Sequence, residues 1–143
     1  MKFIRKGNEP ISFTNWKKDN PNAKYGDLIG EPKKDLRKSL MNEQHSICCY
    51  CECRIKNEDT NPYNSFHIEH FKPKDSDKFP QLQLEYRNLH ASCIKYKSDE
   101  PNIHCGHRKN NEYSNALISP LEEDCSSHFT YKLDGTINDA DNR

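Results

Sequence analysis

Residues 65–74 read SFHIEHFKPK, and this stretch decides the fold. Its apolar and polar residues alternate, which is typical of a β-strand with one buried face. Because alternate side chains of a strand share a face, His67 and Glu69 should project together and His70 should point the other way. A carboxylate can hold a hard cation, and an imidazole can take a proton from water. The stretch therefore predicts a strand over 67–71 that carries residues for metal-assisted hydrolysis.

Cysteines lie on both sides of this strand, in positions that predict a structural zinc site. Cys48 and Cys51 form a C-x-x-C knuckle, and Cys93 and Cys105 supply a second pair with eleven residues between them. Four thiolates make the closed tetrahedral coordination of structural Zn²⁺, which leaves no open position for catalysis. His104 is the alternative to Cys105 as the fourth ligand.

The other three cysteines receive no ligand role. A regular strand would place Cys49, Cys51 and Cys53 on one face, so the assignment of Cys48 depends on the knuckle geometry. Cys125 is expected to be a small buried residue. A zinc-thiolate redox sensor would use the spare thiols, but no basic neighbour clearly lowers the pKa of one of them. We rank that function last.

The composition is that of a chain with a thin core. Only 32% of the 143 residues are apolar, the mean hydropathy is −1.14, and Leu, Ile, Val and Phe together number 25. This content approaches that of disordered chains, but the net charge is zero, and seven tyrosines and one tryptophan favour order. A core this small needs a further constraint, which a bound metal ion can supply.

The sequence also bears on the compartment. The N-terminal residues MKFIRK contain no apolar leader, and no apolar run is long enough to span a membrane. In a reducing cytosol, closely spaced cysteines act as metal ligands rather than as disulfides. We therefore expect a cytoplasmic protein.

Periodicity along the rest of the chain predicts an α+β fold. Leu36, Leu40 and Met41 share one face of an expected amphipathic helix over 31–46. Asp134-Gly135 predicts a hairpin turn between two short strands near the C-terminus. The remaining expectations are an irregular segment over 1–30 with a docking stretch at 10–16, a strand-prone segment over 47–55, a turn-rich loop over 56–64, a strand over 82–90, a polar insertion over 93–102 and a short helix over 104–109.

The order of the motifs along the chain indicates a family. The chain gives C-x-Y-C, then H-x-E-H-x-x-P-K, N-L-H, a single cysteine and C-G-x-x-K. Over about residues 47–109 this order resembles the HNH nuclease superfamily, whose fold is called ββα-metal. The resemblance implies a small zinc-stapled nuclease core, in which two cysteine pairs frame a catalytic hairpin and helix. It also implies a divalent catalytic ion such as Mg²⁺ or Mn²⁺ beside the structural Zn²⁺.

Carried over residue by residue, the resemblance implies roles for four side chains. His70 matches the general base that activates the attacking water. Glu69 stands where the family usually has an aspartate that binds the metal ion. Asn88 matches the asparagine that orients the base, and Lys109 matches the basic residue that closes the motif.

One position departs from the family pattern. The residue after the last zinc cysteine is usually an Asn or His that completes the catalytic metal shell, and here it is Gly106. Because a glycine side chain cannot ligate, His107 or His67 must take over. We expect His107 first, since the predicted helix should aim it at the strand, and His67 second.

Basic residues supply weaker expectations. Residues 1–40 carry ten Lys or Arg against five Asp or Glu, which suits either phosphate contact or a solvated face. The candidate nucleic-acid contacts are Lys72, Lys74 and Lys109. For Lys72 and Lys74, the sequence is equally consistent with side chains that are simply solvated. An HNH site contacts the backbone phosphate, which DNA and RNA share, so the sequence does not show which of the two is the substrate.

The flanking motifs resemble one branch of the superfamily, the HNH subunits of Septu anti-phage systems, which also occur beside certain retrons. This resemblance implies an ABC-type ATPase subunit as partner. We divide the chain into residues 1–45, an extension and helix for packing or partner docking; residues 46–118, the nuclease core with zinc; and residues 119–143, a hairpin. Because the returning strand of this hairpin barely begins before the sequence stops, we expect the hairpin to be truncated. The alternative is a catalytically degenerate zinc module that binds nucleic acid or protein.

Overall fold

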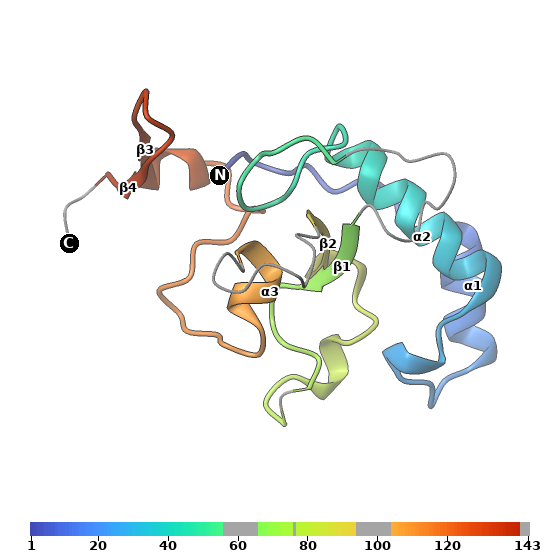
Figure 1. Ribbon diagram of the computed structural model, residues 1–143. Coiled ribbons are helices and arrows are strands. Elements are labelled where there is room, and N and C mark those ends of the chain that lie inside the picture. The colour runs from blue at the N-terminus through green and yellow to red at the C-terminus, as the bar shows by residue number, and fades with distance from the viewer. Residues whose placement is uncertain (56–65, 76, 94–103, 141–143) are drawn as a thin grey trace, which may run out of the picture.

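A computed structural model describes residues 1–55, 66–75, 77–93 and 104–140, and it has the expected α+β architecture (Figure 1). The expected loops over 56–64 and 93–102 lie almost entirely outside these residues. The helices are α1 (Ile11–Asp19), α2 (Gly30–Glu43) and α3 (Cys105–Lys109); the strands are β1 (Phe66–His70), β2 (Leu89–Cys93), β3 (Phe129–Tyr131) and β4 (Ile137–Asp139); and the 3-10 turns are η1 (Tyr25–Asp27), η2 (Pro80–Leu82), η3 (Tyr86–Asn88) and η4 (Cys125–His128).

A two-stranded antiparallel sheet lies at the centre of the fold. β1 pairs with β2 in a register that sets Ile68 opposite Ala91 and Glu69 opposite His90. Both α2 and α3 contact β2, and in Figure 1 the two helices lie on different sides of the sheet. The predicted strand over 67–71 and the predicted short helix over 104–109 are confirmed within one residue.

The predicted strand over 82–90 is wrong for its first half. The chain forms η2 and η3 there, and β2 begins only at Leu89. The side chain of Asn88 explains the difference, because its Nδ2 donates to the carbonyl oxygens of Lys72 and Leu82, at 2.9 and 3.0 Å. These bonds fold the segment into a loop instead of an extended strand.

The amphipathic helix is confirmed as α2. Leu36 and Leu40 are completely buried on its inner face. Arg37 fixes the helix to β1, since its Nη2 donates to the carbonyl oxygen of Phe66 at 2.9 Å and its guanidinium stacks 3.8 Å from the Phe66 ring centroid. The helix ends before the predicted limit because the chain takes positive φ angles at His45 and Ser46.

The expectation of an irregular N-terminal segment is wrong over α1. Phe13 is fully buried and Trp16, three residues later, stacks beside it with ring centroids 6.5 Å apart. Residues i and i+3 share a helix face, so these two aromatic rings are enough to bury one side of α1. The docking role expected for 10–16 stays a prediction.

The first residues are tied into the core by a buried ion pair. Lys6 Nζ lies 2.6 Å from Glu43 Oε1, with side chains 2% and 6% exposed. The Tyr86 hydroxyl donates to Glu43 at 2.8 Å, and Lys6 also donates to the carbonyl oxygen of Leu89. The part of the chain before residue 45 therefore shares its core with the strands, and the boundary at 45 stays a prediction.

The predicted C-terminal hairpin is confirmed as β3 and β4. Gly135 has a φ of +86°, the left-handed conformation that favours glycine. The hairpin stands away from the central sheet in Figure 1, and it exposes Tyr131, Leu133 and Ile137.

Within the described residues, no helix is long and apolar enough to cross a membrane.

Candidate functional site

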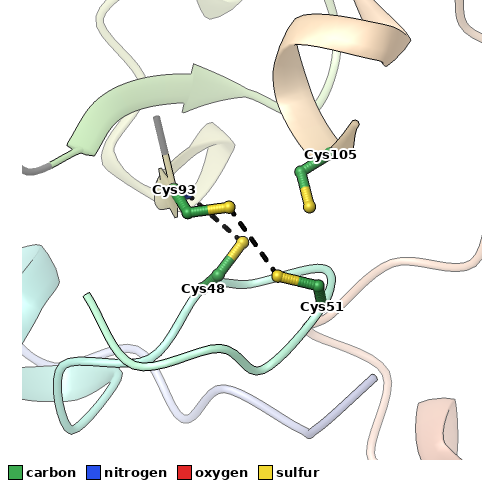
Figure 2. A group of neighbouring side chains, drawn as sticks. All are labelled: Cys48, Cys51, Cys93 and Cys105. Carbon is green, nitrogen blue, oxygen red and sulfur yellow. Dashed lines mark hydrogen bonds between the residues drawn. The ribbon is translucent and has the colours of Figure 1, made fainter. Parts of the chain in front are cut away.

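The four predicted zinc cysteines lie together. The sulfur atoms of Cys48, Cys51, Cys93 and Cys105 are all within 4.8 Å of one another, and Figure 2 shows them converging on one point. Cys51 Sγ is 3.7 Å from Cys93 Sγ. A tetrahedral ion with Zn–S bonds near 2.3 Å separates its sulfur ligands by about 3.8 Å. The cluster therefore has the geometry to hold a zinc ion.

Local structure explains why Cys48 and Cys51 are the pair that converge. Residues 47–55 form a turn with one isolated bridge between Ile47 and Arg54, so the expected strand is wrong. A turn brings residues i and i+3 to the same side, whereas a strand would not. Beside the cluster, His104 Nδ1 lies 3.1 Å from Cys105 Sγ.

The ionisation of these thiols depends on their neighbours. The hydrogen bond with Cys105 lowers the pKa of Cys48 far below its usual range. The same bond raises the pKa of Cys105. Ionisation of one thiol thus opposes ionisation of its neighbour. A bound cation is needed for all four thiols to be ionised together.

A second group of polar side chains lies between β1 and α3. His67 and Glu69 share a strand face as predicted, and His67 Nε2 is 3.2 Å from Glu69 Oε2. The other carboxylate oxygen, Oε1, accepts from the Tyr50 hydroxyl and from Lys109 Nζ, both at 3.0 Å. Burial raises the pKa of Glu69, but the bond with His67 and the charge of Lys109 outweigh it and lower that pKa. Glu69 is therefore an anion whose Oε1 accepts from Tyr50 and Lys109 and whose Oε2 faces His67.

Gly106 allows α3 to approach this pair. A Cβ atom at position 106 would lie 2.3 Å from Glu69 Oε2 and 2.4 Å from His67 Nε2. The departure from the family pattern thus has a steric reason, because His67 and Glu69 occupy the space that a side chain at 106 would need.

Replacing Gly106 by alanine is expected to push His67 away from Glu69 and to lower the free energy of unfolding by about 1–3 kcal/mol. Chemical denaturation measures the change. Gly26→Ala is the matched control, because a Cβ there meets no atom within 4 Å. Equal losses in the two variants would contradict the close approach.

His107 is brought to the same place by α3. Its ring centroid is 4.3 Å from that of His67, and the rings are tilted by 41°. His67 Nδ1 is buried and has no hydrogen-bond partner among the described residues. In the same part of the chain, no third His, Cys, Asp or Glu ligand atom lies within 4.8 Å of both His67 and Glu69. Within this distance, the described residues therefore supply two protein ligands, His67 and Glu69.

His70 faces away from this pair, as predicted. It is buried against the edge of Tyr25, with ring centroids 4.4 Å apart, and its Nε2–H donates to the carbonyl oxygen of Gln83 at 3.0 Å. Burial lowers the pKa of His70 to about 4. The imidazole is therefore neutral near pH 7, and the donated bond leaves its second ring nitrogen, Nδ1, without a proton.

Asn88 acts on the backbone after His70. Its Oδ1 accepts from the N–H of Lys72 at 2.8 Å, and its own carbonyl oxygen accepts from the N–H of Phe71 at 3.0 Å. It closes the loop between β1 and η2, so it positions the residues that follow His70.

The three candidate nucleic-acid lysines differ in their surroundings. Lys109 is 9% exposed and, besides Glu69, bonds the carbonyl oxygen of His70 at 3.0 Å. Lys74 pairs with Asp75 at the surface. Lys72 lies 5.4 Å from the ring centroid of Phe79. Their contact with nucleic acid stays a prediction.

A cavity of about 570 Å³ opens beside this site. Its wall includes Tyr50, Arg108 and Lys109, so it adjoins the carboxylate that two of these residues bind. The rest of its wall includes Leu117 and Ile137, so the cavity has a polar and an apolar part.

Three contacts of the site had no sequence prediction. Tyr50 belongs to the C-x-Y-C motif, but nothing in that motif says that its hydroxyl reaches Glu69. Gln83 binds His70 through a backbone carbonyl, which any residue could supply. Tyr25 comes from a segment expected to be irregular. Only the tertiary fold brings these residues to the strand.

Comparison with known proteins finds two relatives. The chain is 29% identical over 133 residues to the Septu protein PtuB of Bacillus thuringiensis, covering 90% of this chain and 44% of that protein. It is 32% identical over 101 residues to the "Retron Ec83 putative HNH endonuclease" of Escherichia coli, covering 66% and 38%. No family model matches the chain. The chain spans less than half the length of these curated relatives.

These similarities confirm the resemblance to HNH nucleases, and to the Septu branch, that the motifs indicated. The structure agrees at the level of the fold, since it has a small α+β core and a four-cysteine cluster that could hold zinc.

Proposed function

We propose that this chain is the nuclease core of a metal-dependent HNH endonuclease that hydrolyses phosphodiester bonds. The observation that carries the proposal is the His67–Glu69 pair, 3.2 Å apart with Glu69 buried, and the neutral imidazole of His70 on the next residue. One relative supports it by its name, which is that of an HNH endonuclease of a retron.

The carboxylate of Glu69 and an imidazole are the proposed ligands of the catalytic ion. His67 Nε2 is the nearer donor, and His107, which the motif favours, lies against the ring of His67. A carboxylate with imidazoles suits Mg²⁺, Mn²⁺, Ni²⁺ or Zn²⁺. A divalent cation bound there would neutralise charge on the scissile phosphate and on the leaving oxygen.

His70 is the proposed general base. The bond from its Nε2–H to Gln83 fixes the tautomer, so Nδ1 has a lone pair for the proton of the attacking water. The water oxygen forms a bond to phosphorus, the proton passes to His70, and the bond from phosphorus to the leaving oxygen breaks with its electron pair. Asn88 supports this step by fixing the backbone at Lys72 and at Leu82, on the two sides of the loop.

The proposed biological role is that of an effector in anti-phage defence. The name of one relative places it in a Septu system and the name of the other in a retron. The resemblance implies an ABC-type ATPase subunit, PtuA, as partner and controller, with DNA or RNA as substrate. The cytoplasm is the proposed compartment, since thiolate ligands stay reduced there. Lys72, Lys74 and Lys109 are the proposed nucleic-acid contacts.

A cleavage assay with the ATPase present tests this function. Purified zinc-loaded protein is incubated with plasmid DNA and with tRNA, first without a free divalent cation and then with added Mg²⁺ or Mn²⁺. Cleavage that appears with the cation and is absent in Glu69→Gln is the expected result. Cation-independent cleavage, or none on either substrate, would contradict the proposal.

The alternative is a zinc module that binds nucleic acid or protein without cutting. One observation favours it: among the described residues, the His67–Glu69 pair has no third ligand atom within 4.8 Å. The two functions separate in the same experiment, because a binding module would shift the mobility of nucleic acid in a gel and leave its length unchanged.

A further inference from the structure

Tyr50 joins the zinc knuckle to the candidate catalytic carboxylate. It stands between the two knuckle ligands, Cys48 and Cys51, and its hydroxyl donates to Glu69 Oε1 at 3.0 Å. The backbone that carries it is fixed to the sheet, since the N–H of Cys49 donates to the carbonyl oxygen of Ala91 at 3.0 Å. A side chain of the zinc site thus reaches 19 residues along the sequence to β1.

The two oxygens of Glu69 have different surroundings. Oε1 accepts from both Tyr50 and Lys109, while Oε2 faces His67 Nε2 at 3.2 Å. The side chain of Glu69 is 7% exposed and that of Lys109 is 9% exposed. Turning the carboxylate plane away from these two donors would leave the Tyr50 hydroxyl and the buried Lys109 ammonium without their acceptor. The two bonds therefore fix the orientation of the carboxylate, with one oxygen toward Tyr50 and Lys109 and the other toward His67.

We propose that Tyr50 is a positioning residue that holds Glu69 by Oε1 so that Oε2, beside His67 Nε2, is presented to the catalytic cation. The inference rests on the proposed function and deepens it, because it assigns one carboxylate oxygen to the cation and the other to the protein. Lys109 shares Oε1 but also bonds the carbonyl oxygen of His70. Tyr50 supplies a neutral donor whose position depends on the zinc knuckle.

The substitution Tyr50→Phe tests this role. It keeps the ring in the cavity wall and removes only the hydroxyl. Residues that orient a metal ligand without touching the metal change its affinity by about 10–100-fold. We expect the dissociation constant for Mn²⁺ to rise by about tenfold, measured by electron paramagnetic resonance of free Mn²⁺ in titrations of zinc-loaded protein. The zinc content should stay as in the wild type, and saturating Mn²⁺ should restore most of the cleavage.

Tyr113→Phe is the matched control, because Tyr113 lines the same cavity and packs through its ring against Phe71 and Phe79. It should bind Mn²⁺ as the wild type does. Equal Mn²⁺ affinity in Tyr50→Phe and the wild type would overturn the inference, as would a wild-type protein that binds no Mn²⁺. Wild-type protein that binds Mn²⁺ but cuts no nucleic acid would instead refute the proposed function, and the affinity comparison would still decide the role of Tyr50.

Discussion

Replacing His70 by alanine is expected to slow cleavage by about 10²–10⁴-fold, the usual contribution of a general base. The side chain is neutral near pH 7, because burial lowers its pKa to about 4, and Gln83 holds its Nε2–H. Removing the imidazole leaves the attacking water without a proton acceptor. Single-turnover cleavage with saturating protein measures the chemical step without a contribution from product release.

Two further variants separate catalysis from packing. His70→Gln keeps a polar side chain near Gln83 but cannot take up a proton, so it should be as slow as His70→Ala even where its thermal stability is higher. His128→Ala, in η4, removes an imidazole from another part of the chain and should cut as the wild type does. Wild-type cleavage rates in both His70 variants would refute the assignment of the base.

The parts of the fold that the sequence predicted are those governed by local pattern. Alternation placed His67 and Glu69 on one face of β1, and the Asp134-Gly135 turn placed the hairpin of β3 and β4. The pair spacing of the knuckle selected Cys48 and Cys51, which converge with the two later cysteines. In each case, neighbouring residues determine the geometry, so the sequence contains it.

The parts that the sequence did not predict depend on contacts between distant segments. α1 is stabilised by burying Phe13 and Trp16 rather than by a strong helical pattern of its own. The segment before β2 reads as an alternating strand, but the hydrogen bonds of Asn88 across 16 residues fold it into turns. From the sequence, Gly106 suggests that a metal ligand has been lost. The structure shows instead that His67 and Glu69 fill the space that a side chain at this position would need.

Replacing Cys93 by serine is expected to unfold most of the chain. The four sulfur atoms join the knuckle, the end of β2 and the start of α3, which are otherwise linked through a small core. Structural zinc contributes about 10–16 kcal/mol to the folding of small zinc domains. That is comparable to the roughly 5–15 kcal/mol that stabilises a whole domain. Circular dichroism and the zinc content of the purified protein measure the two losses together.

Cys53→Ser is the control that separates zinc ligation from cysteine chemistry in general. Cys53 is exposed and lies only two residues from a member of the cluster, but it is not part of it. This variant should keep one tightly bound zinc ion and the thermal unfolding of the wild type. A wild-type protein with less than one zinc ion per chain, or a Cys93→Ser protein that unfolds as the wild type does, would show that the core is stable without the metal.

Because Tyr50 extends from the same knuckle to Glu69, slow removal of zinc by a chelator should abolish cleavage no later than it unfolds the chain.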